Sequence, residues 1–463
     1  MIKRLGILTA GGDTPALNAT ILGAVRAASE AKVEVVGLLN GFASFFQDNA
    51  PHVILNPLFQ EIPQLDATRG GTILGSSRTY VNDGDPAFLA SIERRINRLK
   101  LDGLVCIGGD GTLNGLQPIC KMVPTVLAPK TIDNDLGLNY AGEADQWVKL
   151  DVNGVDTYRK EPHPTGLDAD FCIDRMINYA TPGYATAVYE AAEGVRRVRT
   201  TAESHHRIAI IEVMGRHSGY IAIGASYGQP DMILIPEYQF DLESVAERVR
   251  TIYEHQQHVV IVCGEGIIGN DGREYGASSG STDPSGNMVL SGAAASLADA
   301  LLEIIGETFF TRNGNFSTGK AAFFTRKVGH TQRGGRPLRF DRFYASQLGG
   351  NATQMLLDGE NNSVSTLQWD ESSGFKVSKH DSSIFRDKYG EIHARTVHPS
   401  FYNQKNFLLS EEGKQYLHPI FAEAIGAEDT EFIRQSLFDF GNLYHGYKSV
   451  NVDIAKLTRY LSE

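Results

Sequence analysis

Three segments of the sequence place glycine and aspartate directly after short apolar runs, where they could bind phosphate and a divalent cation. In the first segment, Gly11 and Gly12 follow the apolar run 5–10. Glycines let phosphate oxygens approach backbone N–H groups, and a helix beginning near Pro15 would add the partial positive charge of its N-terminus. The segment therefore fits a phosphate cradle, although a tight strand-to-helix turn without a ligand would have the same sequence.

The second segment is the GGDGT sequence at 108–112, which follows the apolar run 104–107 and sets Asp110 between glycines. Mg²⁺ takes few protein carboxylates and shares oxygens of a substrate phosphate, so one aspartate in a glycine turn at a strand end suits this ion. An aspartate that only completes a turn is the alternative. The glycines on both sides exceed what a turn needs, which favours the metal site.

The third segment is PKTIDND at 129–135, again just past an apolar run. Asp133 and Asp135 are two residues apart, so their environments can differ. One carboxylate can then accept a proton from a hydroxyl while the other supports the metal. An ordinary Asx turn is the alternative, and it is weakened because the same sheet would bring the Asp110 loop nearby.

A fourth group is basic and lies at predicted strand or turn edges. The planar guanidinium of arginine suits phosphate, although any one of these side chains could simply be a solvated charge. The group consists of Arg78, Arg207, Arg216, His330 and Arg333.

Composition limits the classes of protein that the chain can belong to. Its 463 residues predict about two to three domains. With 43 Lys and Arg against 55 Asp and Glu, the net charge is −12, which makes nucleic acid a poor candidate partner. The four cysteines have no CxxC spacing, which favours a reducing, cytoplasmic location. No apolar stretch reaches about 18 residues and no signal peptide is evident, so we expect no membrane association and no export.

Short apolar runs alternate with helical patterns along the chain, which predicts an α/β fold with parallel sheets, two in number. Thr14-Pro15 and Asp85-Pro86 each predict a helix start, with a capping residue followed by proline. Residues 139–171 and 269–288 break the rhythm and are interpreted as loops or insertions. The expected strands are 5–10, 33–39, 104–107, 125–128, 208–213, 232–235 and 259–262.

From about residue 362 the chain becomes polar, and separated apolar helical patterns follow, such as Phe432, Leu437 and Phe440. We interpret this part as a C-terminal appendage. The sequence gives no indication of its role.

Seven ordered motifs together resemble the 6-phosphofructokinase family, over residues from about 1 to 358. They are GGDTPALNA, GGTILGSSR, GGDGT, PKTIDND, EVMGRHSG, GEG and GHTQRGG. The resemblance implies phosphoryl transfer to the 1-hydroxyl of fructose 6-phosphate, with Mg²⁺ as cofactor. It also implies a homo-oligomer, dimer or tetramer, with an active site between subunits.

The family implies two doubly wound, Rossmann-like α/β lobes with the active site in their cleft. Residues 1–139, together with about 332–385, would form the lobe that binds the phosphoryl donor. Residues 173–331 would form the sugar-phosphate lobe. Residues 140–172 would be an insertion, and 386–463 a C-terminal extension.

Matching the motifs residue by residue implies a role for each site residue. Asp133 would be the base that activates the hydroxyl, and the other catalytic residues would be Thr131, Arg78 and Arg216. The donor would be held by Gly11, Gly12, Arg78, Gly109, Asp110, Gly111, Thr112 and Lys130. The sugar phosphate would be held by Thr131, Asp133, Arg207, Met214, Gly215, Arg216, Glu265, Arg326, His330 and Arg333. Asp110 and Asp135 would bind Mg²⁺, and Arg207 would reach a neighbouring subunit's substrate.

Three departures from the family pattern bear on the substrates. Gly111 is typical of ATP enzymes and Lys130 of pyrophosphate enzymes; we favour ATP because Gly111 leaves room for its α-phosphate. Phe324 stands where an arginine usually grips the 6-phosphate, and Arg326 could substitute or the acceptor could be another sugar or sugar phosphate. The insertion could form a lid or an acceptor-selecting wall.

Two alternatives remain at the sequence level. NAD kinases and diacylglycerol kinases also contain GGDGT, but they would not explain TIDND and GHTQRGG. A non-catalytic nucleotide or sugar-phosphate sensor is the other alternative, and the retained Asp110, Asp133 and Asp135 argue against it.

Overall fold

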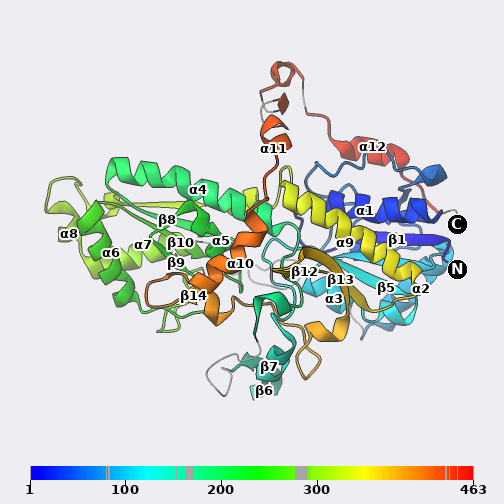
Figure 1. Ribbon diagram of the computed structural model, residues 1–463, viewed down its shortest axis with the longest axis horizontal. Helices are drawn as coiled ribbons and strands as arrows, with labels where there is room; N and C mark the ends of the chain where they lie inside the picture. Colours follow the sequence, from blue (N-terminus) through cyan, green and yellow to red (C-terminus); the bar gives the residue numbers. More distant parts are fainter. Residues whose placement is uncertain are drawn as a thin grey trace.

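The strands of the protein form two main sheets, which lie side by side along its long axis (Figure 1). The computed structural model describes residues 2–79, 81, 84–152, 154–161, 171–276, 290, 292–432, 435–436, 438–445 and 447–461.

The first sheet has seven strands in the order β13-β12-β5-β4-β1-β2-β3. All neighbours pair in parallel except the edge strands β3 and β13. Helices α1 (Leu17–Glu30) and α9 (Arg339–Leu357) pack on one face, and α2 (Pro86–Leu99) packs on the other. The strands are β1 (Arg4–Thr9), β2 (Glu34–Leu38), β3 (His52–Ile54), β4 (Gly103–Gly108), β5 (Thr125–Pro129), β12 (Ser363–Asp370) and β13 (Gly374–Asp381).

The second sheet has four parallel strands in the order β11-β8-β10-β9. Its strands are β8 (Ile208–Val213), β9 (Met232–Leu234), β10 (Val259–Gly264) and β11 (Phe323–Lys327). One face is covered by α4 (Tyr184–His205) and α5 (Tyr220–Gly224), and the other by α6 (Leu242–Gln256) and α7 (Ala293–Ile305), beside the short α8 (Glu307–Thr311).

Each of the seven apolar runs predicted as a strand is a strand in one of these sheets. Because helices cover both faces of each sheet, the apolar side chains of these strands are buried, which explains why the runs lack alternation. The predicted α/β class with two parallel-sheet lobes is confirmed.

The two predicted helix starts have different outcomes. Asp85 caps α2, because its carboxylate accepts hydrogen bonds from the backbone N–H groups of Ala87 and Phe88, both at 3.0 Å. Thr14 does not cap α1, which begins only at Leu17. The Thr14 carbonyl instead accepts a hydrogen bond from the N–H of Gly71 at 3.3 Å, which holds this residue in the loop before the helix.

Capping by Asp85 predicts a measurable stability effect. We expect Asp85→Ala to destabilise the protein by about 1 kcal/mol, since two helix N–H groups lose their acceptor. Thermal or denaturant unfolding measures this change. The control is Glu93→Ala, which removes an exposed carboxylate from the middle of the same helix; an equal loss in both variants would contradict the capping role.

The region interpreted as an insertion contains a β-hairpin, β6 (Trp147–Val152) and β7 (Val155–Lys160), not a loop alone. Residues 149–152 of β6 are exposed, so the alternation of apolar and polar residues along 148–152 does not mark a buried face of this hairpin. Residues 162–170 of the predicted insertion and 277–288 of the predicted glycine-rich loop lie outside the described residues.

The chain from about residue 362 is not all appendage, because residues 363–381 form β12 and β13 of the first sheet. The C-terminal appendage that follows contains α10 (Glu411–Phe421), α11 (Ala427–Phe432) and α12 (Val450–Leu457), together with the short strands β14 (Tyr402–Asn403) and β15 (Leu408–Leu409). It crosses from the second lobe through α11 to α12, which lies beside the first lobe (Figure 1). The predicted position Leu437 lies outside the described residues.

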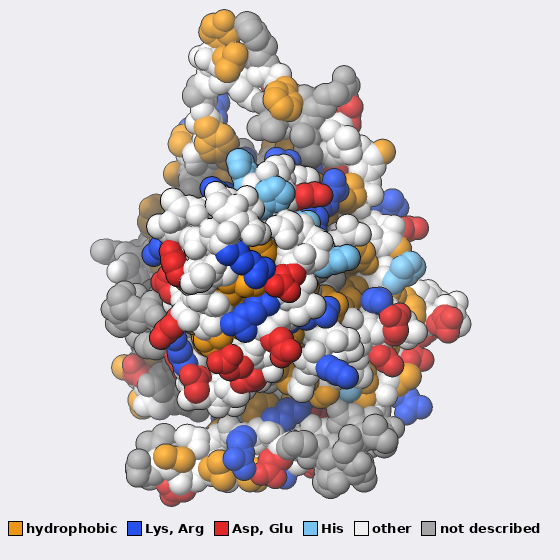
Figure 2. Space-filling model, turned by 90° about the vertical axis from the view of Figure 1, so that its left-hand side faces the viewer, with side chains coloured by type: hydrophobic (Ala, Val, Ile, Leu, Met, Phe, Trp, Pro, Cys, Tyr) orange, Lys and Arg blue, Asp and Glu red, His pale blue; other side chains and the backbone are white. Residues whose placement is uncertain are grey.

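Basic and acidic side chains are intermingled on the end of the molecule that the second lobe forms (Figure 2). The described residues of this face therefore form no continuous basic surface of the kind that binds a nucleic-acid backbone. In the part of the chain that the structure describes, no helix combines the length and apolarity needed to cross a membrane.

Candidate active site

The predicted donor turn follows β1 at the carboxyl end of the first sheet. Gly11 adopts a φ of +82°, a conformation that favours glycine, and its N–H donates a hydrogen bond to the carbonyl of Ser77 at 2.9 Å. This contact joins the turn to the 70–78 loop. The two segments border a cavity of about 910 Å³ lined by Gly11, Gly12, Asp13, Phe46, Thr72, Ser76, Ser77, Arg78 and Thr79.

The GGDGT turn lies at the end of the neighbouring strand β4. Gly109 precedes the short helix α3 (Asp110–Gly115), in which Thr112 is buried. The N–H of Gly137 donates a hydrogen bond to the Asp110 carboxylate at 3.2 Å. Burial, together with the charge of Asp135, raises the pKa of Asp110 well above its usual value.

The TIDND turn follows β5, the next strand of the sheet. The Thr131 hydroxyl donates to Asp135 at 2.9 Å and accepts from the N–H of Asp133 at 3.1 Å. The Asp133 Oδ1 atom is buried and has no hydrogen-bond partner among the described residues. Burial, and secondly the charge of Asp135, raise the pKa of Asp133 to about 7. A carboxylate with this pKa is suited to accept a proton near neutral pH.

Lys130 connects the TIDND turn to the donor turn. Its side chain is buried, and its Nζ donates a hydrogen bond to the carbonyl of Gly12. Burial, followed by the positive charge of Arg333, lowers the pKa of Lys130 to about 7.

The loops after β8 and β10 meet at the carboxyl end of the second sheet. A Cβ atom on Gly266 would lie 1.9 Å from the carbonyl oxygen of Arg216, so only glycine permits this approach. Gly215 has a φ of +116°, and the N–H of Met214 donates to the side chain of Gln332 at 3.0 Å. A cavity of about 240 Å³ is lined by Arg216, His217, Glu265, Gly266, Ile267, Ile268, Glu274, Gly276 and Leu290.

Arg333 extends from the GHTQRGG loop toward the donor turn. Its Nη1 donates to the carbonyl of Asp13 at 3.3 Å, and its charge lowers the pKa values of both Asp133 and Glu265. Desolvation has a larger, opposite effect on both carboxyls, and it raises the pKa of Glu265 overall. Arg333, assigned from sequence to the sugar phosphate, therefore also contacts the donor side.

The structure does not bring every predicted residue to this place. Arg207 precedes the first residue of β8, whereas Met214 follows its last, so the whole strand separates the two. Arg326 is exposed on the edge strand β11, and Phe324 of the same strand packs partly buried against the core of the second lobe. His330 is exposed beside the Arg333 loop. The roles of these residues remain predictions.

The carboxylates fit a shared Mg²⁺ ion. Asp110 and Asp135 follow adjacent strands and repel one another electrostatically, and a cation would relieve this repulsion. In the described ranges, no group of three or more His, Cys, Asp or Glu side chains is placed to hold a metal ion by itself. Mg²⁺ commonly takes one or two carboxylates and completes its shell with water and phosphate oxygens, so a pair is enough.

Residues of the C-terminal appendage also reach the site, and the sequence analysis missed them. The buried Arg395 donates hydrogen bonds to the carbonyl of Asn134, between the two aspartates of the TIDND turn. Arg386 donates to Asn114 of α3 at 3.1 Å. No local motif marks these arginines, because each is more than 250 residues from its partner in the sequence.

Comparison with known proteins agrees with this geometry. The sequence model of the family described as Phosphofructokinase matches residues 4–140 and 169–356. The chain belongs to the phosphofructokinase family. It is therefore a phosphotransferase of the phosphofructokinase type, as its motifs predict.

Relatives within the phosphofructokinase family carry two kinds of name. The chain is 33% identical over 408 residues to a pyrophosphate–fructose 6-phosphate 1-phosphotransferase of Amycolatopsis methanolica, covering 87% of this chain and 98% of the relative. It is 31% identical over 369 residues to an ATP-dependent 6-phosphofructokinase of Corynebacterium efficiens, covering 79% and 90%. Sequence similarity therefore leaves the donor open.

A solved structure shares the fold. The pyrophosphate-dependent phosphofructokinase of Nitrosospira multiformis superposes with a TM-score of 0.68 at 17% identity, covering 92% of this chain and 93% of that one. At this identity the similarity supports the two-lobed phosphofructokinase fold alone.

Proposed function

We propose that this protein is a Mg²⁺-dependent 6-phosphofructokinase that transfers the terminal phosphoryl group of ATP to the 1-hydroxyl of fructose 6-phosphate. The observation that carries the proposal is Asp133, whose Oδ1 is buried and without a partner among the described residues, with a pKa near 7. A group of this kind beside a magnesium-type carboxylate pair is suited to take a proton from a sugar hydroxyl as the phosphoryl group arrives.

The remaining residues would position the reactants and neutralise charge. Arg78 and the Gly11 turn would bind the donor phosphates, and Thr131 would lie beside the transferred group. Bound Mg²⁺, held by Asp110 and Asp135, would supply positive charge to the phosphate oxygens. Phosphoryl transfer needs little more than this from a protein, because positioning and electrostatics dominate its catalysis.

Two features of the donor side favour ATP. Phe46 lines the donor cavity and is 59% exposed; one face of its ring stacks on Phe88, with 4.6 Å between ring centroids, and the exposed part is available to a nucleobase. A Cβ placed on Gly111 would meet no atom within 4 Å, so the space beside it is open to an α-phosphate. Pyrophosphate has neither a nucleobase to place beside Phe46 nor an α-phosphate to place beside Gly111.

Pyrophosphate remains the second candidate donor, since Lys130 and several relatives' names favour it. The experiment that tests the proposal measures phosphoryl transfer to fructose 6-phosphate with Mg²⁺, comparing matched ATP and pyrophosphate by phosphorus NMR. Turnover with ATP supports the proposal, turnover with pyrophosphate alone replaces the donor, and none with either would overturn the assignment of these substrates.

For the acceptor, the cavity that Arg216 and Glu265 line supports a sugar-phosphate site. Its complete form would be inter-subunit in a homo-oligomer, because Arg207 lies at the far end of β8 and Arg326 at an exposed edge. We further propose that the first sheet belongs to the donor lobe and the second to the acceptor lobe.

The four cysteines are free thiols, which supports a reducing, cytoplasmic location.

Lys130 predicts a pH dependence of donor binding. The pKa of Lys130 is lowered to about 7, so its ammonium loses its proton as pH rises through 7. The charged form binds phosphate better than the neutral amine does. We expect the KM for the donor to rise between about pH 6 and about pH 8, with a limit of tenfold per pH unit above the pKa.

The matched control for this pH dependence is Lys130→Arg, which stays charged over the whole range. The titration of the donor itself cancels when the donor KM of the variant is divided by that of wild type at each pH, because both enzymes bind the same donor. A ratio that does not change with pH would contradict the role of Lys130 titration.

A further inference from the structure

Two segments that lie outside the family match pack against one another. They are residues 141–168 and the chain beyond 356. The ring of Trp147 in β6 stacks on His393, with 3.5 Å between ring centroids and 12° between planes. Lys388 donates a hydrogen bond to the carbonyl of Asp145 at 3.0 Å. The insertion and the C-terminal appendage are thus one structural unit in their described parts.

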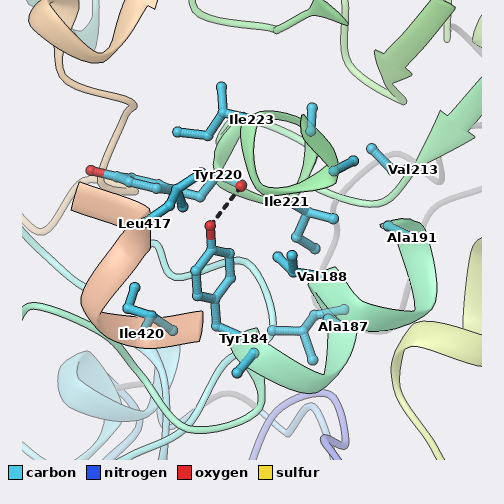
Figure 3. Packing of buried hydrophobic residues seen from close by; sticks show 14 of the residues in the cluster. Tyr184, Ala187, Val188, Ala191, Val213, Tyr220, Ile221, Ile223, Leu417 and Ile420 are labelled. Carbon is cyan, nitrogen blue, oxygen red and sulfur yellow. Dashed lines mark hydrogen bonds between the residues drawn. The ribbon is translucent and has the colours of Figure 1, made fainter. Parts of the chain in front are cut away.

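The appendage is anchored in the core of the second lobe through α10. Leu417 and Ile420 of this helix are buried beside Tyr184 of α4 and Tyr220 of α5 (Figure 3). The Tyr184 hydroxyl donates to the Tyr220 carbonyl at 2.8 Å, which ties α4 to α5 under the helix. Buried contacts of α10 therefore attach the appendage, and the insertion that packs on it, to the second lobe.

From this anchored unit, Arg395 reaches the TIDND turn with both its backbone and its side chain. Its N–H donates to the carbonyl of Asp135 at 2.7 Å, and its Nε and Nη2 donate to the carbonyl of Asn134 at 2.9 and 2.6 Å. Its Nη1 donates to the carbonyl of Asn178. The residue is 1% exposed. Burying a cation costs free energy, so an apolar side chain would be more favourable here if this position only had to be packed.

Asn134, the residue held in this way, has a conformation that needs support. Its φ of +55° lies in the left-handed region, which asparagine tolerates better than most residues with a side chain but which still costs free energy relative to the usual conformations. Its Nδ2 donates to the hydroxyl of Tyr416 in α10 at 2.6 Å, and its Oδ1 accepts from the N–H of Thr181 at 2.9 Å. Because Asn134 stands between Asp133 and Asp135, its backbone sets the directions of both carboxylates.

We propose that Arg395 and Tyr416 are positioning residues for the reaction: they act through Asn134 to hold Asp133 and Asp135 in place. The inference rests on the proposed function, in which these aspartates are the base and a magnesium ligand. The C-terminal appendage is then part of the active site's support, although it does not touch the reacting atoms. The charge of Arg395 also lowers the pKa of Asp110, in opposition to the larger effect of burial.

Two tyrosine variants form a matched pair that tests this role. Tyr416→Phe removes the hydroxyl that binds Asn134, whereas Tyr402→Phe removes a buried hydroxyl of the same appendage that donates to the carbonyl of Ile233 at 2.6 Å, in the second lobe. We expect Tyr416→Phe to lower kcat about tenfold to hundredfold, with KM values changed less than about threefold, since a small misplacement of a catalytic group costs this much. Tyr402→Phe should keep the wild-type kcat.

Thermal unfolding of both variants separates positioning from stability. We expect both variants to be folded at the assay temperature, with the larger decrease in melting temperature for Tyr416→Phe, because its hydroxyl also donates to the carbonyl of Tyr179 at 3.0 Å, whereas Tyr402→Phe loses one hydrogen bond. Arg395→Lys and Arg395→Met extend the series: kcat should fall in the order wild type, lysine, methionine, since a lysine retains the charge but not the guanidinium fork. If either fails to fold, the tyrosine pair still decides the question.

The same assay contains wild type and Asp133→Asn, so that the two hypotheses fail in different ways. Absence of wild-type turnover, or full activity of Asp133→Asn, would overturn the proposed function and this inference with it. If Asp133→Asn is inactive but Tyr416→Phe and Tyr402→Phe have equal kcat values, only the positioning role is overturned. A fall in kcat that merely follows the melting temperature across all variants would also overturn it.

Discussion

Asp133→Asn is expected to lower kcat by about 10²–10⁴-fold with ATP and fructose 6-phosphate, the range that a general base contributes. The amide cannot accept the proton of the sugar hydroxyl, but it has nearly the same size and shape as the carboxylate. Substrate KM values should therefore change little. Steady-state kinetics measures the loss, and a residual kcat above about a tenth of wild type would exclude Asp133 as the base.

The same variant should be more stable than wild type, although its kcat is lower. Burial and then Asp135 raise the pKa of Asp133 to about 7, well above that of an aspartate in an unfolded chain, so the charged form destabilises the fold above pH 7. This cost develops as pH rises from about 4, where an aspartate of the unfolded chain ionises, to about 7, where Asp133 ionises in the fold, and it is constant at higher pH. A neutral amide avoids it. We expect the melting temperature of Asp133→Asn to exceed that of wild type most at pH 7 and above, and the difference to shrink toward zero as pH falls to about 4.

Asp133 could be predicted from sequence because the chemistry of this site is local. Each glycine and aspartate turn directly follows an apolar run, and a parallel sheet brings the ends of such runs to one edge. The relevant contacts are short in sequence: Thr131 donates to Asp135, only four residues away. The seven motifs then indicated the family without reference to coordinates.

Arg395 could not be predicted in the same way, because its partner Asn134 is 261 residues away. Nothing near Arg395 distinguishes it from a solvated arginine. Thr14 illustrates the complementary limit: its local pattern is that of a helix cap, but a tertiary hydrogen bond to Gly71 holds it outside the helix. Local patterns fail where a contact distant in sequence sets the geometry.

The second large effect is expected from Gly111→Asp, which tests how the site selects its donor. A Cβ on Gly111 would meet no atom within 4 Å, and the position is in the first turn of α3, where an acidic residue is favourable for the helix. The variant should therefore fold. If the α-phosphate of ATP lies about 5 Å from the new carboxylate, repulsion of about 3 kcal/mol would lower kcat/KM for ATP roughly hundredfold.

Gly111→Ala is the matched control for this substitution, because it adds volume without charge. We expect it to retain most of the ATP activity, whereas the activity of Gly111→Asp with pyrophosphate, which has no α-phosphate, should fall much less than its activity with ATP. Equal ATP losses in both variants would show that space and not charge is limiting. Equal losses with both donors would place the α-phosphate away from Gly111, and Lys130 would then become the residue to test for donor choice.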